Sequence, residues 1–247
     1  MSRIDEIAAD VFRISTYVDA AGLQFNQFLI RDDEPLLYHA GQNALFADVL
    51  DAVTSLVDPG TLRWIGFSHF EADECGALNR WLAAAPNALP LAGLVAARTS
   101  IDDFAARAPR VLADDEVVGI GRHRLRLVAT PHVPHNWEAS LLFDETERVL
   151  FCSDVLAQHG RTAPVAADVL EHAVRGLEQG ERGPMRHAIP YTGDTQATFE
   201  RLAGLGPATL AIMHGASVQG DGAAVLRAYD RALARVVGPE RPSAAGR

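Results

Sequence analysis

Histidine and carboxylate side chains recur in this chain at spacings that suit metal binding. The densest segment, Ser68-His69-Phe70-Glu71-Ala72-Asp73, places three such side chains on alternating residues. Three further candidates, His135, Asp154 and His214, lie at distant positions in the sequence. Imidazole nitrogens and carboxylate oxygens are the ligands that zinc, iron and manganese take from proteins. These residue types therefore predict a metal centre and a reaction that a metal ion promotes.

The carboxylates of Glu71, Asp73 and Asp154 would share one cleft if these segments meet, and Glu74 is a candidate fourth. Unpaired charges in a cleft lose hydration and repel one another, which is unfavourable by several kcal/mol. Two divalent cations would cancel that repulsion. Asp154 is the best candidate to bridge them. Each ion would then keep about three to four protein ligands and an open position, as reactive metal sites do.

Each candidate follows an apolar run with the length and composition of a buried strand. Strands that end at one edge of a sheet bring the loops after them together, so the candidates would meet there. Several strand ends that all finish in ligand-type residues are stronger evidence for one metal site than any single spacing. The predicted strands and the candidates after them are Leu62–Phe67 with His69, Glu71 and Asp73; His123–Thr130 with His132 and His135; Arg148–Cys152 with Asp154; and Ala208–Met213 with His214.

The remaining pattern predicts an α/β fold in which two mixed β-sheets pack face to face with helices outside. A β-β-β-α-β-α order occurs twice along the chain. We expect a single domain over residues 1–237 and a disordered tail over residues 238–247, which is rich in Pro, Gly and Ala. The further predicted strands are Val11–Tyr17, Phe25–Arg31, Leu36–His39 and Ser140–Asp144, and the predicted helices are Ala44–Leu56, Cys75–Ala84, Val169–Gln179, Gln196–Leu205 and Ala223–Val237.

Composition narrows the class of protein. A length of 247 residues with 48% hydrophobic content is enough for one substantial core. A net charge of -10 argues against nonspecific binding to nucleic acid or to an anionic membrane. We see no membrane span and no secretory signal, and two cysteines, Cys75 and Cys152, form no disulfide framework, so a cytoplasmic protein is expected. Lysine is absent, which excludes Schiff-base chemistry.

Three segments resemble the metallo-β-lactamase superfamily: Gly66–Gly76, Phe151–Asp154 and Met213–Gly215. Within it they are similar to the flavodiiron branch and its stand-alone relatives, the oxygen-binding di-iron proteins. Hydrolases of the superfamily typically carry His-x-His-x-Asp-His, whereas this chain has His-x-Glu-x-Asp-Glu from position 69. The additional hard oxygen ligand favours iron over zinc. The resemblance extends from about Ile7 to Val237 and implies the metallo-β-lactamase αββα sandwich.

The resemblance also implies a ligand set for two metals. The family usually has a histidine where this chain has Glu74, so Glu74 could bind the second metal, point away from it or leave that site more open. His135 is preferred over His132, because the flavodiiron pattern places an aromatic residue eight positions after the ligand histidine and Phe143 stands there. The implied ligands are His69, Glu71, His135 and Asp154 for the first metal, and Asp73, Asp154 and His214 for the second.

No catalytic side chain is expected beyond the metal ligands. His132 is a candidate hydrogen-bond partner for a ligand. His159 either lines the pocket or lies on a surface loop, and Tyr191 either donates a hydrogen bond to a metal-bound group or packs a loop. His39 is expected to support the metal loops. Two further histidines, His123 and His172, are interpreted as surface positions.

By the same resemblance, we expect a di-iron protein that binds, and as an enzyme reduces, dioxygen or nitric oxide, or that senses oxygen. The alternative is a metal-dependent hydrolase of an ester or phosphodiester, with zinc or manganese. Flavodiiron enzymes carry a flavodoxin-like domain, and this chain ends at Arg247. We therefore expect no flavin in this chain, a separate electron-donor or signalling protein as partner, and a homodimer. Neither nucleic acid nor a membrane is an expected partner.

Overall fold

The computed structural model describes residues 2–238, in which two β-sheets pack face to face. The first sheet has seven strands in chain order, and its last four strands run parallel. These strands are β1 (Arg3–Ala8), β2 (Val11–Val18), β3 (Leu23–Ile30), β4 (Leu36–Tyr38), β5 (Trp64–Gly66), β6 (Leu89–Gly93) and β7 (Arg110–Leu112). Of the tail predicted over residues 238–247, all but Gly238 lies outside the described residues.

The second sheet has six strands in the order β13-β12-β11-β10-β9-β8. Its only parallel pair is β11 with β12, and the other neighbours are antiparallel. Both sheets are therefore mixed. The strands are β8 (Val117–Gly119), β9 (Arg124–Ala129), β10 (Ser140–Asp144), β11 (Val149–Ser153), β12 (Thr209–Ile212) and β13 (Val218–Gln219).

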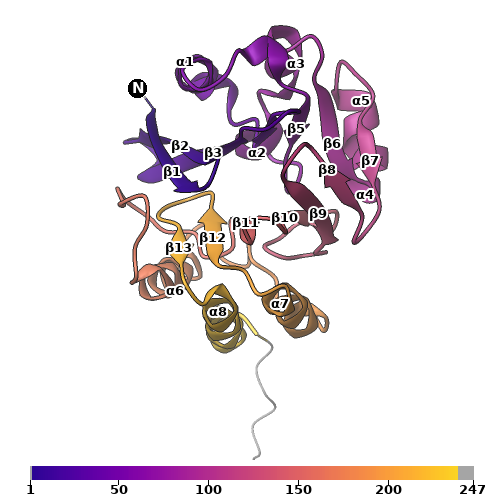
Figure 1. The fold of residues 1–247 in the computed structure, drawn as a ribbon. Helices are drawn as coiled ribbons and strands as arrows, with labels where there is room; N and C mark the ends of the chain where they lie inside the picture. Colours follow the sequence, from indigo (N-terminus) through magenta and orange to yellow (C-terminus); the bar gives the residue numbers. More distant parts are fainter. Residues whose placement is uncertain (1, 239–247) are drawn as a thin grey trace, which may run out of the picture.

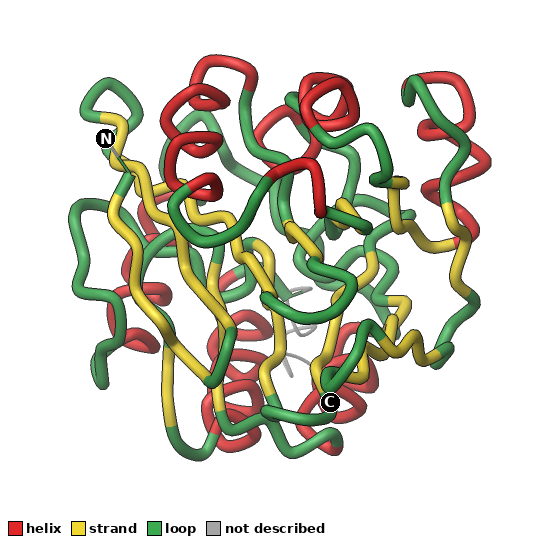
Figure 2. The backbone as a smooth tube through the Cα atoms, turned by 45° about the horizontal axis from the view of Figure 1, so that its top comes forward, coloured by secondary structure: helices red, strands yellow, loops and turns green. Residues whose placement is uncertain are grey.

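Helices cover the outer face of each sheet (Figure 1), and the strands form the middle of the molecule in a second view (Figure 2). Helices α1 (Phe46–Thr54) and α3 (Leu78–Ala84) lie on the first sheet, and α6 (Val169–Gly180), α7 (Thr195–Gly204) and α8 (Gly222–Val236) lie on the second. This arrangement confirms the predicted αββα sandwich. Shorter helical turns span Asn43–Leu45, Pro59–Thr61, α2 (Ala72–Cys75), α4 (Leu94–Ala96), Ala97–Ile101 and α5 (Asp102–Phe104).

Apolar side chains fill the space between the sheets as well as the two helix-covered faces. Phe28, Tyr38 and Phe151 pack together between the sheets, with ring centroids 5.3–5.4 Å apart for the pairs that involve Phe151. Burying one such side chain contributes about 1.5–3 kcal/mol. Helix α8 packs on the second sheet through Leu226 and Leu233, and Asp221 caps its first turn. The sheets are therefore held rigidly where the metal-ligand candidates leave them.

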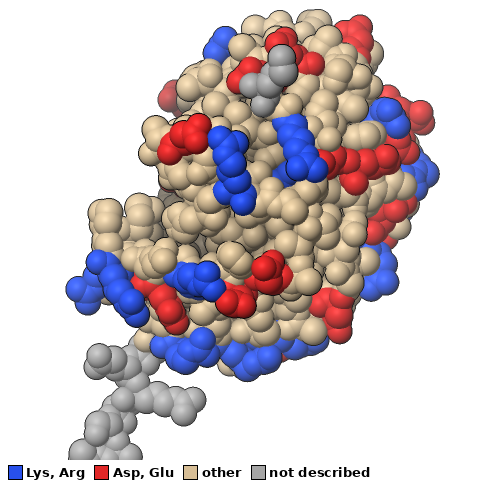
Figure 3. All heavy atoms as spheres, turned by 90° about the vertical axis from the view of Figure 1, so that its left-hand side faces the viewer, with Lys and Arg blue, Asp and Glu red and all other residues tan. Residues whose placement is uncertain are grey.

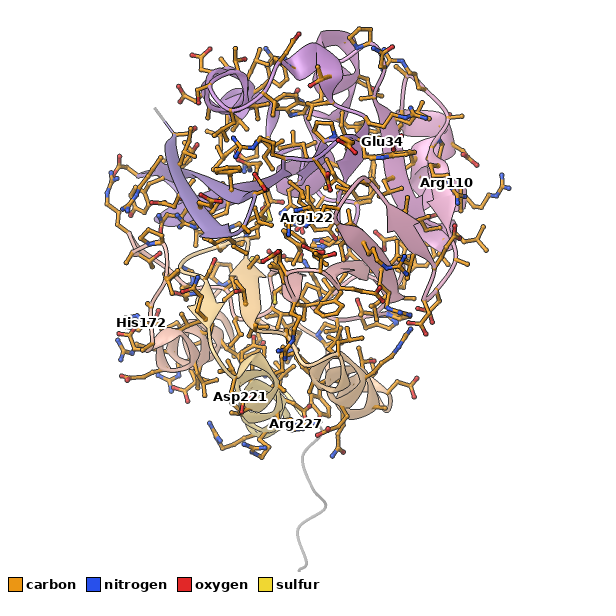
Figure 4. The ribbon with its side chains drawn as sticks, viewed as in Figure 1. Glu34, Arg110, Arg122, His172, Asp221 and Arg227 are labelled. Atoms are coloured by element: carbon orange, nitrogen blue, oxygen red, sulfur yellow. The ribbon has the colours of Figure 1, made fainter. Side chains whose placement is uncertain are left out.

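Several elements differ from the predictions. The strands β1, β6, β7 and β8 were not predicted: β7 and β8 have three residues each, β6 contains a proline, and β1 is a charged edge strand. The interpretation of His123 as a surface residue is wrong: it is fully buried, and its Nδ1 lies 2.7 Å from Asp144 Oδ2. His172, in contrast, is exposed on α6 and points outward (Figure 4).

Basic and acidic side chains are interspersed on the face that Figure 3 shows, so the net charge is not gathered there into a patch of one sign. No helix within residues 2–238 is both long enough and apolar enough to cross a bilayer.

Candidate metal centre

Four strand ends bring the candidate ligands together at one edge of the sandwich. The loop after β5 carries His69, the loop after β9 carries His135, and the loops after β11 and β12 carry Asp154 and His214. Ser153, at the end of β11, has a positive φ of 52°, which turns the chain sharply just before Asp154. The prediction that these loops meet rested only on where the predicted strands end. In the structure the four loops do lie together at one edge of the sandwich.

One group of four side chains has the spacing of a metal site. His69, Glu71, His135 and Asp154 each offer one ligand atom, and these atoms lie within 4.8 Å of one another. Glu71 Oε2 is 3.0 Å from His69 Nε2, and Asp154 Oδ2 is 3.0 Å from His135 Nε2. Nitrogen and oxygen atoms therefore face a common point, which is how ligands surround an ion.

A second group lies on the other side of Asp154. His214 Nε2 is 3.1 Å from Asp154 Oδ1 and 3.3 Å from Asp73 Oδ2. Asp154 Oδ1 is buried, yet no group of the described residues donates it a hydrogen bond of normal geometry. The two oxygens of Asp154 thus face two different ligand groups. A carboxylate with one buried and unsatisfied oxygen fits a position between two cations.

The charges in the site stabilise one another in the metal-free protein. Burial lowers the pKa of His69, but Glu74, Glu71 and Asp154 outweigh it and raise the pKa to about 9. Burial acts likewise on His214, and contacts with Asp154 and Asp73 raise its pKa well above the ordinary value. Burial would raise the pKa of Asp154, but contacts with its histidine neighbours hold it well below the ordinary value. The carboxylate of Asp154 is therefore ionised and suited to receive cations.

The turn that carries His214 is held by buried hydrogen bonds from β2 and β3. His214 Nδ1 donates to the carbonyl oxygen of Gln24 at 2.8 Å, which leaves Nε2 free to bind a metal ion. Asn26 Nδ2 donates to the carbonyls of Ile212 and Gly215, and the buried Arg13 donates to the latter at 2.9 Å. Gly215 has a φ of +121°, so the turn favours glycine at that position.

We expect Asn26→Ala to lower the free energy of unfolding of the metal-free protein by about 2 kcal/mol, because two buried hydrogen bonds are lost and the carbonyl of Gly215 keeps only its bond from Arg13. Denaturant unfolding measures this loss. Asn87→Ala, at an exposed position, is the control and should change stability by less than about 0.5 kcal/mol. Equal stability of the two variants would contradict this role for Asn26.

Glu74 lies behind the site and not in it. Its side chain is fully buried, and Ser153 Oγ, Ser68 N and His39 Nε2 contact its oxygens at 2.7, 3.2 and 3.0 Å. Burial would raise the pKa of Glu74, but His39 and His69 lower it to about 2. His39 is thus buried beneath the metal loops, the position from which it was expected to support them.

A cavity of about 530 Å³ opens beside the ligand group. Its walls are mainly apolar and come from α6 and the segment that follows it, with Leu177 and Ile189 among them. His159 lines this cavity and packs over Gly176. Tyr229, which sequence reasoning missed, lines it as well. Only the fold could identify Tyr229, because its place on α8 carries no ligand pattern.

Tyr191 and His132, the two other candidates beyond the proposed ligands, do not line the cavity. Tyr191 is not among the residues that line the cavity, and its hydroxyl donates to Asp230 Oδ1 at 3.0 Å. It packs against the core of the second sheet, which agrees with the loop-packing reading and not with donation to a metal-bound group. The backbone N–H of His132 donates to the carbonyl of Asn136 in a turn, and its side chain belongs neither to the ligand group nor to the cavity lining.

Both cysteines lie close to ligand segments but are buried, and burial raises the pKa of the Cys75 thiol to about 12 and that of Cys152 still higher. A raised pKa keeps a thiol protonated and unreactive at neutral pH. We therefore expect a thiol-labelling reagent at pH 8 to modify neither cysteine in the folded protein and both after unfolding. Rapid labelling of the folded protein would contradict this.

Residues 23–215 match the family described as ODP family beta lactamase. Over 142 residues the chain is 26% identical to a putative diflavin flavoprotein A 1 of Nostoc sp., which covers 56% of this chain and 24% of that protein. Over 228 residues it is 23% identical to an anaerobic nitric oxide reductase flavorubredoxin of Pectobacterium carotovorum, with coverages of 88% and 44%. The chain thus spans less than half the length of these curated relatives.

Solved structures share the fold. The rubredoxin oxygen:oxidoreductase of Desulfovibrio gigas superposes with a TM-score of 0.77 at 15% identity, covering 93% of this chain and 61% of that one. A flavodiiron core from Synechocystis sp. gives a TM-score of 0.77 at 20% identity, covering 94% and 61%. At these identities the likeness establishes the fold, and the chemistry must be argued from the residues.

Proposed function

This chain belongs to the ODP family of beta lactamases, and on that premise we propose that it holds two iron ions and binds and reduces dioxygen or nitric oxide. The observation that carries the proposal is the position of Asp154, whose two oxygens face two separate ligand groups. Its neighbours supply both nitrogen and hard oxygen ligands, a mixture that suits iron. The relatives named above are called a nitric oxide reductase and an oxygen oxidoreductase, which supports the choice of reactants.

We assign His69, Glu71, His135 and Asp154 to the first ion, and Asp73, Asp154 and His214 to the second. When bound, two iron ions would bind a diatomic molecule and pass on to it the electrons that a donor provides. The protein contributes the rest. The hydrogen bond from His214 Nδ1 to the carbonyl of Gln24 orients one imidazole, and apolar side chains that include Leu177 and Ile189 line the cavity beside the site.

Electrons would come from a separate protein. The name of a further relative, the rubredoxin-oxygen oxidoreductase of Megalodesulfovibrio gigas, pairs rubredoxin with oxygen chemistry. We therefore propose a small redox protein as the donor for this chain. A homodimer is the assembly that we propose from the resemblance.

The size of the cavity favours a second candidate function. A volume of about 530 Å³ is in the range of pockets that take organic ligands and far exceeds a diatomic molecule. Hydrolysis of an ester or phosphodiester, with the metals activating water and polarising the substrate, would use that space. The glutamate at position 71 favours the iron reading over this one.

Three measurements separate these functions. The iron-loaded protein is supplied with an artificial electron donor, and consumption of dioxygen and of nitric oxide is followed. We expect consumption of at least one of them. A spectral change on adding the gas without consumption would identify a sensor. Turnover of chromogenic esters or phosphodiesters with zinc or manganese, and no gas consumption with iron, would identify a hydrolase and overturn the proposal.

A further inference from the structure

Glu74 is the next carboxylate after Asp73 in the sequence, yet the two side chains lie in different environments. Asp73 lines the cavity beside the ligand group, whereas Glu74 is fully buried and is not part of the lining. Both oxygens of Glu74 are occupied by protein groups. Oε1 accepts from Ser153 Oγ, while Oε2 accepts from Ser68 N and contacts His39 Nε2. Each oxygen of Glu74 thus has a protein partner outside the cavity lining.

A continuous chain of hydrogen bonds leads from His69 to Glu74. His69 Nδ1 lies 2.9 Å from Ser68 Oγ, which donates to Ser153 Oγ at 2.7 Å, which in turn donates to Glu74 Oε1 at 2.7 Å. Because each hydroxyl donates one proton and the carboxylate only accepts, the chain has a single direction. The direction places a proton on His69 Nδ1. The lone pair of His69 Nε2 is thereby aimed at Glu71 and Asp154, where the first ion would lie.

We propose that Glu74 is a positioning residue for His69 and not a ligand, so that Asp73, Asp154 and His214 alone hold the second ion. This inference rests on the proposed two-metal function. The first ion then has four protein ligands, and the second has two of its own and shares Asp154. The second ion is consequently the weaker bound and the more open to reactants. We expect the two dissociation constants to differ by at least about tenfold.

The test is a titration of the full chain, stripped of metal by a chelator, with Co²⁺, whose visible absorption depends on its ligands. The wild type should bind in two steps. Asp73→Asn identifies the second step by weakening it alone. Glu74→Ala should weaken the first step by about 10- to 100-fold, the usual effect of losing a group that orients a ligand, and leave the second within about threefold. Glu74→Gln keeps an oxygen acceptor for Ser153 and should restore most of the first-step affinity.

The opposite pattern overturns the inference. If Glu74 were a ligand, Glu74→Ala and Glu74→Gln would both weaken the second step and leave the first unchanged. Circular dichroism checks that each variant is folded, and if the alanine variant is not, the glutamine variant still decides between the two patterns. A wild type that binds two ions with equal affinity would also contradict the inference. Failure of the wild type to bind Co²⁺ at all would instead count against the proposed function.

Discussion

Asp154→Asn is expected to reduce the metal content of the purified protein from about two ions per chain to fewer than one. The reason is geometric, since Asp154 lies 3.0 Å from His135 through one oxygen and 3.1 Å from His214 through the other. An amide has one oxygen instead of two and no charge, so one proposed site loses a ligand and the other keeps only a neutral oxygen. Loss of an orienting group alone costs about 10–100-fold in affinity, and loss of a shared ligand should exceed about 100-fold.

Elemental analysis of the variant measures this effect, and competition with a chelator gives the affinity. Asp194→Asn is the matched control, because it makes the same chemical change at an exposed position before α7. The control should keep the wild-type metal content. Asp154→Asn protein that also kept it would show that Asp154 does not bridge two metals.

His39→Leu should destabilise the metal-free protein by about 3–5 kcal/mol, because it leaves the buried carboxylate of Glu74 without the imidazole that contacts it. His39 Nε2 and Glu74 Oε2 lie 3.0 Å apart, and both side chains are fully buried. The measurement is denaturant unfolding with and without bound metal. The loss should appear in the metal-free protein, since the pair holds the loops together before any ion binds.

The double variant His39→Leu/Glu74→Met is the control for this pair. Removing both partners leaves no isolated buried charge, so part of the lost stability should return. A single variant that costs less than about 1 kcal/mol, or a double variant less stable than either single one, would contradict the importance of the pair.

Much of the site could be predicted because strand ends and ligand-type residues coincide in the sequence. The apolar run Leu62–Phe67 predicts a buried strand. The residues after it must leave the sheet at the end of that strand, which predicted the position of His69. Asp154 was the best candidate for a bridging carboxylate, but the turn at Ser153 and the register shift between β11 and β12, which direct its two oxygens, could not be predicted. Local patterns do not encode such a shift.

The orientation of Glu74 was left open for the same physical reason. Its direction is decided by His39, which emerges from the end of β4, and by Ser153, which ends β11. Neither neighbour is close to it in sequence. His123 was misread because its partner Asp144 reaches it only across the pairing of β9 with β10. Long-range contacts of this kind decide whether a polar side chain is buried. Hydrophobic periodicity indicates only which side of a strand or helix is apolar.

Elemental analysis of protein produced without added metal, together with its absorption spectrum, tests the metal centre most directly. We predict about two irons per chain and a visible or near-ultraviolet absorption that is lost on reduction. About two zinc ions and a colourless protein would contradict the iron assignment and favour hydrolysis. Protein that contains no metal and takes none up on exposure to iron would contradict the assignment of Glu71, Asp73 and Asp154 as ligands.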